Sequence, residues 1–226
     1  MGFVRRRAPA LLVVALVLVG GAALVTGRGS GEASVAPEPE PVVRGEEAIS
    51  RFLEAWESGR TGTYVVRSAF RRIRTTGQHF EHSVLTVQSP PDHLTIDGGS
   101  VAGVLDGVRV ACSVDDEGQR QCREGETVPS DAYDRAVVDQ LATLEGYVTG
   151  PDPLYEVAVD AEDCFVLDQQ RPLPAAPYGT RARFCFDPGT GAPTFTEIAR
   201  PEGTDRLEAV EVRGEVTEQD LTIPPA

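Results

Sequence analysis

Short runs of alternating apolar and polar residues, separated by tight turns, constrain this chain more than any other feature. In residues 180–199 two such runs flank a turn at residues 187–191, Asp-Pro-Gly-Thr-Gly. Pro188 fixes φ, and Gly189 and Gly191 accept positive φ, so the turn has a local physical cause. The pattern predicts a β-hairpin. Its apolar positions are Ala182, Phe184, Phe186, Phe195 and Ile198.

Most of the remaining chain repeats this pattern. Asp106-Gly107 is typical of a two-residue hairpin turn. Strands are predicted over residues 63–74, 80–88, 94–96, 101–105, 108–114, 119–123, 155–159, 164–167 and 206–216. Because neighbouring strands follow one another through short turns, we expect an antiparallel sheet.

Two stretches have helical rather than strand periodicity. Residues 46–58 place apolar side chains at helical spacing, and residues 130–145 do the same. Ser130 is a candidate cap for the second helix, and Gly59 and Gly146 are expected to end the two helices. The sum of strands and helices predicts an α+β domain.

The N-terminal segment predicts a membrane anchor. Three arginines, at positions 5–7, precede residues 8–26, an uncharged stretch rich in Leu, Val and Ala. As a helix this stretch is about 28 Å long, close to the thickness of the bilayer core. The arginines place the N-terminus in the cytoplasm. A cleaved signal peptide is the alternative; Ser34-Val35-Ala36 has suitably small residues, but Pro37 disfavours cleavage after it.

The predicted organisation follows from this leader. Residues 1–7 form a cytoplasmic stub, 8–26 a signal-anchor, 27–44 a flexible linker rich in Gly, Pro and Glu, and 45–226 an extracytoplasmic domain. We expect a single-pass protein of the cell membrane, secreted if the leader is cleaved.

Composition excludes some partners. The net charge is −14, whereas nucleic-acid binding requires a basic face. All basic residues are arginine, and the chain has no lysine and no asparagine, which indicates a GC-rich genome such as that of an actinobacterium. One basic cluster stands out on a predicted strand, and a charged outer face is its commoner explanation, with contact to an anionic headgroup as the alternative. It comprises Arg67, Arg71, Arg72 and Arg74.

Four cysteines in an extracytoplasmic domain favour two disulfides, with three pairings open. Cys112 and Cys122 flank one predicted hairpin, and Cys164 and Cys185 lie on successive predicted strands. We therefore favour these two local pairs. No C-x-x-C motif or histidine at ligand spacing supports a metal site.

Signals for catalysis are absent from the sequence. His79 and His82 lie three residues apart on a predicted strand and so point to opposite faces, and no nucleophile or phosphate-loop motif occurs. We expect no enzyme, no cofactor and no metal.

The order of these elements resembles a known family. The predicted N-terminal helix, the strand Tyr-x-Val-x-x-x-Phe (Tyr64, Val66, Phe70), the strand meander and the hairpin Phe-Asp-Pro-x-Thr-Gly-x-Pro at residues 186–193 are similar to the LolA/LolB-like half-barrel superfamily. RseB and the mycobacterial lipoproteins LppX and LprG belong to it. The resemblance implies a curved antiparallel sheet wrapped around helices, with an apolar cavity for acyl chains. This chain departs from the mycobacterial lipoproteins because no cysteine follows its leader.

The resemblance implies a non-enzymatic, membrane-tethered domain that binds lipid or another hydrophobic ligand. An aromatic residue on a helix stripe is more often core, and this is the alternative for Trp56. The other function is an RseB-like interaction or sensor domain acting through a partner membrane protein; a cell-wall structural module is a third. An open apolar cavity would favour the first function, a packed interior the second. Candidate cavity residues are Trp56, Tyr64, Val66, Phe70, Tyr133 and Phe184.

Overall fold

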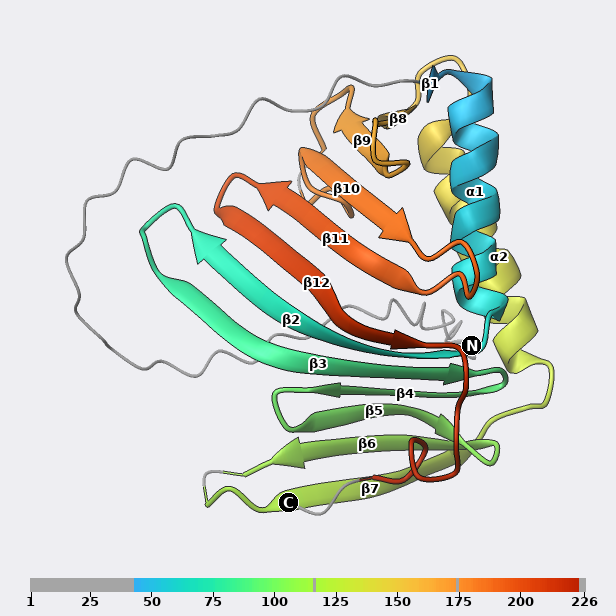
Figure 1. The fold of residues 1–226 in the computed structure, drawn as a ribbon, viewed down its shortest axis with the longest axis vertical. Coiled ribbons are helices and arrows are strands. Elements are labelled where there is room, and N and C mark those ends of the chain that lie inside the picture. The colour runs from blue at the N-terminus through green and yellow to red at the C-terminus, as the bar shows by residue number, and fades with distance from the viewer. Residues whose placement is uncertain (1–42, 116, 174, 224–226) are drawn as a thin grey trace, which may run out of the picture. The chain divides into compact units, whose positions relative to one another are not determined.

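A computed structural model describes residues 43–115, 117–173 and 175–223 of this chain. Twelve strands form one antiparallel sheet, and the two helices lie on the same face of it (Figure 1). The predicted α+β class and antiparallel sheet are confirmed. The anchor predicted at residues 8–26 lies outside the described residues, and no helix within them is long and apolar enough to cross a bilayer.

The sheet combines two meanders. One contains β2 (Tyr64–Arg74), β3 (His79–Ser89), β4 (Asp92–Asp97), β5 (Ser100–Leu105), β6 (Val108–Val114) and β7 (Arg120–Thr127). The other contains β8 (Tyr155–Val159), β9 (Phe165–Gln169), β10 (Arg181–Phe186), β11 (Pro193–Arg200) and β12 (Gly203–Arg213), with the short β1 (Val43–Arg44) paired to β8. The long pairing of β12 with β2 joins them into the order β1-β8-β9-β10-β11-β12-β2-β3-β4-β5-β6-β7. β1 uses the end of the predicted linker.

Most predicted turns are present. Asp106 and Gly107 both have positive φ, 50° and 71°, as a two-residue hairpin between β5 and β6 requires. The turn at residues 187–191 joins β10 to β11, and the Asp187 carboxylate accepts hydrogen bonds from the N–H of Gly189 and of Thr190.

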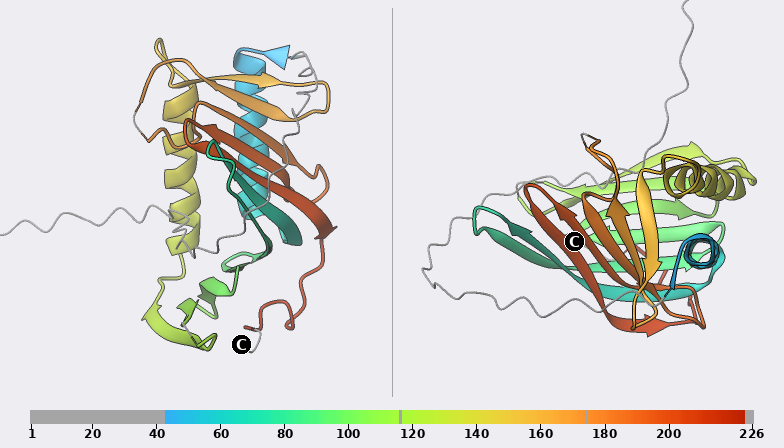
Figure 2. Two further views of the ribbon diagram at one scale, coloured as in Figure 1. Left: turned by 90° about the vertical axis from the view of Figure 1, so that its left-hand side faces the viewer. Right: turned by 90° about the horizontal axis from the view of Figure 1, so that it is seen from above.

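The two helices pack on the face of the sheet that we call the inner face. Phe52 of α1 (Glu46–Thr61) is fully buried, and its ring lies 5.4 Å from that of Phe165 on β9. Leu144 and Val148 of α2 (Ala132–Val148) complete the same cluster. Burial of each such side chain contributes about 1.5–3 kcal/mol. Figure 2 shows both helices against one end of the curved sheet.

A second cluster forms on the opposite, outer face. Val87, Leu94 and Val101 from β3, β4 and β5 are buried there, and the chain that follows β12 covers them with Leu221 and Ile223. The C-terminal segment therefore shields the apolar part of the outer face.

The predicted helix ends are wrong for a tertiary reason. Gly59 lies inside α1 and is buried, and the helix continues to Thr61, where Gly62 caps it by donating its N–H to the carbonyl of Ser58 at 2.8 Å. In α2 the N-cap is Asp131 rather than Ser130, and the helix continues past Gly146 to Val148. Packing against the sheet extends both helices beyond residues that would stop an isolated helix.

The expected disulfides are present. Cys112 pairs with Cys122 directly across β6 and β7, and Cys164 pairs with Cys185 across the adjacent ends of β9 and β10. No free cysteine remains. β7 ends the sheet within the described ranges.

The glycines of the two helices provide a test of the packing between α1 and the β10–β11 turn. A Cβ on Gly59 would lie 2.9 Å from the carbonyl oxygen of Gly191, whereas a Cβ on Gly146 would meet nothing within 4 Å. We expect Gly59→Ala to lower the free energy of unfolding by about 1–3 kcal/mol through overpacking. The matched control, Gly146→Ala, should raise it by about 0.5–1 kcal/mol. Urea denaturation measures both, and stabilisation by Gly59→Ala would contradict this contact.

Candidate functional site

Side chains from three elements satisfy the backbone at the C-terminal end of α1. The Tyr64 hydroxyl of β2 donates to the carbonyl of Gly59 at 2.8 Å. The amide of Gln88, from β3, and the hydroxyl of Tyr133, from α2, both donate to the carbonyl of Arg60. These bonds occupy carbonyls that a helix end leaves without a partner. Two predicted cavity residues, Tyr64 and Tyr133, thus hold α1 in place.

The tyrosines near this end of α1 resist ionisation. Burial raises the pKa of Tyr64 to about 12, against a smaller lowering by the nearby Arg60 guanidinium. Burial also raises the pKa of Tyr178 to about 12. Both hydroxyls remain hydrogen-bond donors at any physiological pH.

His93 lies on the inner face beside Tyr133, and their ring centroids are 5.5 Å apart. Burial lowers the pKa of His93, and the positive charges of Arg60 and Arg109 lower it further, while the Pro91 carbonyl and Asp92 act in the opposite direction. A neutral imidazole can both donate and accept a hydrogen bond. The sequence pattern did not single out this cluster because its members come from four different elements.

Trp56 and Phe184 lie in the packed core rather than beside an open space. Their ring centroids are 5.5 Å apart, and Tyr178 is 5.9 Å from Trp56. The indole N–H of Trp56 is buried and has no hydrogen-bond partner among the described residues. The guanidinium of Arg60 lies 5.4 Å from the centre of the Trp56 ring.

Val66 and Phe70 lie further along the inner face of β2. Phe70 is buried, and its ring is 4.7 Å from that of His82 and 5.8 Å from the Arg72 guanidinium. The cross-strand partners of Phe70 are Leu207 of β12 and His82 of β3. The six predicted cavity residues therefore occupy three neighbouring places: the aromatic core, the end of α1 and the inner face of β2.

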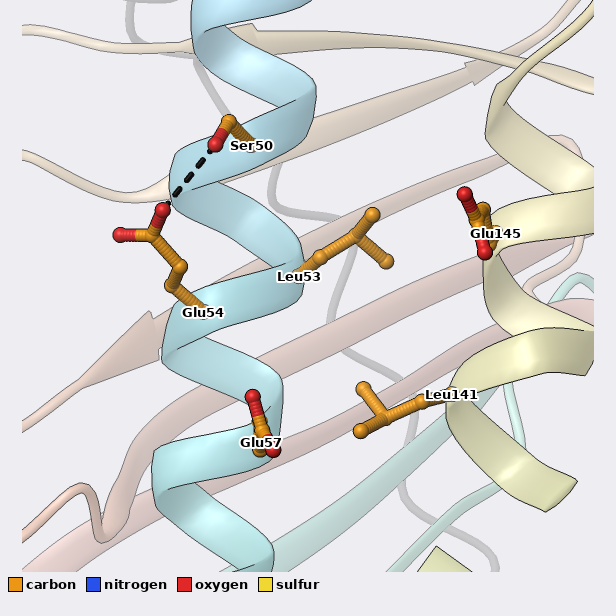
Figure 3. Close-up of a pocket in the computed structure, with 6 residues that line it drawn as sticks. All are labelled: Ser50, Leu53, Glu54, Glu57, Leu141 and Glu145. Carbon is orange, nitrogen blue, oxygen red and sulfur yellow. Dashed lines mark hydrogen bonds between the residues drawn. The ribbon is translucent and has the colours of Figure 1, made fainter. Parts of the chain in front are cut away.

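Two pockets in the described part of the chain lie elsewhere. One, of about 230 Å³, lies between α1 and α2, where Leu53 and Leu141 point toward each other (Figure 3). Ser50, Glu54, Glu57 and Glu145 complete its lining. The other, of about 200 Å³, lies at the β2–β3 hairpin tip. Neither is lined by any of the six predicted residues.

Potential metal ligands do not gather anywhere in residues 43–115, 117–173 and 175–223 in groups of three or more. The polar clusters on the inner face instead pair a cation with a carboxylate, as Arg72 does with Asp205, or place a neutral histidine among tyrosine and arginine. Such an arrangement can bind and orient a ligand.

Comparison with known proteins gives distant structural matches. The sequence matches no protein-family model and no curated protein sequence. MucB aligns with a TM-score of 0.40 and 15% identity over 80% of this chain and 64% of the MucB chain. MucB in complex with MucA(peri) aligns with a TM-score of 0.37 and 14% identity, over 77% of this chain and 59% of that one. This chain therefore spans less than two thirds of the length of either MucB chain.

A LolA superfamily protein from Nitrosomonas europaea aligns with a TM-score of 0.33 and 9% identity, over 80% of this chain and 99% of that one. At such TM-scores these matches carry no inference about family or function, and any function is inferred from the geometry of this chain.

The buried tyrosines predict an alkaline loss of stability. In the unfolded chain Tyr64 and Tyr178 ionise near pH 10, and in the folded domain near pH 12. Titration of these two hydroxyls should therefore leave the free energy of unfolding unchanged below pH 10. That free energy should fall as the pH rises from 10 toward 12, because the unfolded chain loses these protons first. Urea denaturation at pH 8 and pH 11 measures how much the free energy of unfolding falls between these two pH values. The fall should be smaller in Tyr178→Phe, which has one buried hydroxyl fewer to ionise. An unchanged fall in that variant would show that Tyr178 is not shielded from solvent.

Proposed function

We propose that this protein is a membrane-tethered extracytoplasmic domain that binds lipid or another hydrophobic ligand on the inner face of a half-barrel sheet. Residues 8–26 would be the tether. One observation carries the proposal: apolar side chains continue along the inner face of β12, β2 and β3 beyond the strands that the helices cover. We call this set the inner stripe; it comprises Val66, Phe70, Val84, Leu207 and Ala209.

The helices do not account for the inner stripe. α1 and α2 lie against β1 and β8 and pack side chains on β9 and β10, and the cluster they form with the sheet includes no member of the inner stripe. Val66 and Ala209 belong to a small separate cluster, and Phe70 and Val84 are buried outside all three clusters. An apolar strip between strands is suited to an acyl chain, whose affinity comes from removing apolar surface from water.

A second candidate function is supported by the pocket between α1 and α2. Leu53 and Leu141 form its apolar part, and Glu57 and Glu145 make no ion pair within the described residues. Such a site fits a basic, amphipathic segment of a partner membrane protein. The aromatic core under α1, where Trp56 and Phe184 are in contact, also agrees with an interaction domain whose interior serves as a scaffold.

Photo-cross-linking in cells distinguishes the two functions. The full chain is expressed in a bacterial membrane in cells grown with a diazirine-bearing palmitic acid, irradiated, and its peptides are mapped. We expect labels on the β2 and β12 peptides as well as on residues 8–26. Labels confined to residues 8–26 would overturn lipid binding by the domain and leave the partner-binding function.

A matched pair of variants on β12 locates the ligand. Leu207→Glu places a charge on the inner stripe and should reduce β2 labelling by about tenfold, because a charge is costly in an apolar site. Val210→Glu, at an exposed position on the same strand, should leave it unchanged. Equal labelling in both variants would place the ligand elsewhere, provided that both retain the melting temperature of the parent protein.

A further inference from the structure

Two arginines beside the inner stripe have no carboxylate partner. Arg60 and Arg109 are exposed and make no ion pair in the described part of the chain, whereas Arg72 of the inner face is paired with Asp205. In a chain with a net charge of −14, carboxylates are abundant. Arg60 lies over the Trp56 ring, but neither arginine has a carboxylate to neutralise its charge, so both can pair with an anion from outside the chain.

Strand register brings these arginines to either side of one polar group, which consists of Gln88, His93 and Tyr133. The carbonyl of Arg60 accepts hydrogen bonds from Gln88 and Tyr133, so the last turn of α1 is fixed against β3 and α2. Gln88 is the direct cross-strand partner of His93. His93 on β4 is the cross-strand partner of Val104 on β5, and Val104 is the partner of Arg109 on β6. The three side chains therefore lie on the same face of the sheet.

Two carboxylates that influence this group do not neutralise it. Asp92 accepts a hydrogen bond from the N–H of Asp106 at 2.9 Å, and Asp134 lies in the first turn of α2. Both influence the group electrostatically, Asp92 through His93 and Asp134 through Tyr133. Neither forms an ion pair with Arg60 or Arg109 among the described residues.

The polar group adjoins one end of the inner stripe. The row Tyr64–Gln88–His93 lies next to the row that contains Val66, because side chains two residues apart along β2 share a face. Phe70 follows further along the strand, and the Arg72–Asp205 pair occupies the next inner-face position. An amphipathic molecule placed here would have its polar end at Arg60 and its apolar part along the stripe.

We propose that Arg60 and Arg109, together with the His93 ring, bind the phosphate or carboxylate group of the ligand. The proposal rests on the proposed function, since the apolar part of that ligand occupies the inner stripe. The guanidinium groups supply charge-assisted hydrogen bonds. His93, whose Nδ1 lies 3.3 Å from the Pro91 carbonyl oxygen, donates to the anion from Nε2 when it is protonated. The Tyr133 hydroxyl, which donates its hydrogen to the Arg60 carbonyl, positions the end of α1 beside the site.

Histidine NMR on the full chain in dodecyl maltoside micelles tests the site, because only three histidines are present. A bound anion next to His93 favours its protonated form and should raise its pKa, whereas His79 at the β2–β3 hairpin tip should not respond. The probes are inorganic phosphate, dihexanoylphosphatidic acid and, as a lipid without net charge, dihexanoylphosphatidylcholine. We expect a response of His93 to the phosphatidic acid at far lower concentration than to inorganic phosphate, and a weaker response to the phosphatidylcholine, whose phosphate carries a single charge beside its own cation.

Variants assign the response to the arginines. Arg60→Gln and Arg109→Gln should each weaken phosphatidic acid binding by about tenfold, the contribution of one charge-assisted hydrogen bond. Arg67→Gln removes the same charge from the outer face and should leave binding unchanged. Equal weakening by all three would show a nonspecific charge effect and overturn the site.

The outcomes also separate this site from the proposed function. Acyl cross-links on β2 and β12 without any response of His93 would overturn the anion site and leave lipid binding intact. A response to inorganic phosphate as strong as that to phosphatidic acid would assign the site to free anions and overturn its role as a headgroup site. No response to any probe would overturn the proposal.

Discussion

The close approach of the β10–β11 turn to the end of α1 is the constraint on which the domain depends. Gly191 has φ +73°, and a Cβ there would lie 2.6 Å from the backbone of Ser58. A Cβ on Gly62 would lie 2.3 Å from the carbonyl oxygen of Thr190. Because neither backbone carries a side chain at the contact, α1 can lie low enough over β9 and β10 for Phe52 to reach Phe165 and Phe184.

The same end of α1 connects the two meanders. Its carbonyls are bonded by Tyr64 on β2, Gln88 on β3 and Tyr133 on α2, while its aromatic side chains pack on β9 and β10. The helix is thus fixed to both meanders, which otherwise meet through the pairing of β12 with β2. The proposed anion site lies at this junction, so a ligand there would contact elements that are far apart in the sequence.

Local features of this chain were predictable, and non-local ones were not. The Asp106-Gly107 turn, the 187–191 turn and the pairing of Cys112 with Cys122 depend on residues close in sequence, and each follows from turn chemistry or strand adjacency. Gly59 does not end α1 as its residue type predicts, because a glycine is needed there for the close contact with Gly191, 132 positions away. The grouping of Arg60, His93 and Arg109 depends on register across four elements, which no local pattern encodes.

The charged edge strand β7 has a consequence for encounters between copies of this domain. An open sheet ends in a row of unused backbone donors and acceptors, through which crowded copies of a domain can pair edge to edge. Arg123 and Glu126 of this strand are exposed, so a second strand could add only by removing water from charges. The Cys112–Cys122 link holds β7 against β6 and prevents it from peeling away to pair with a neighbour. Many copies of the domain can therefore lie side by side without joining through this edge.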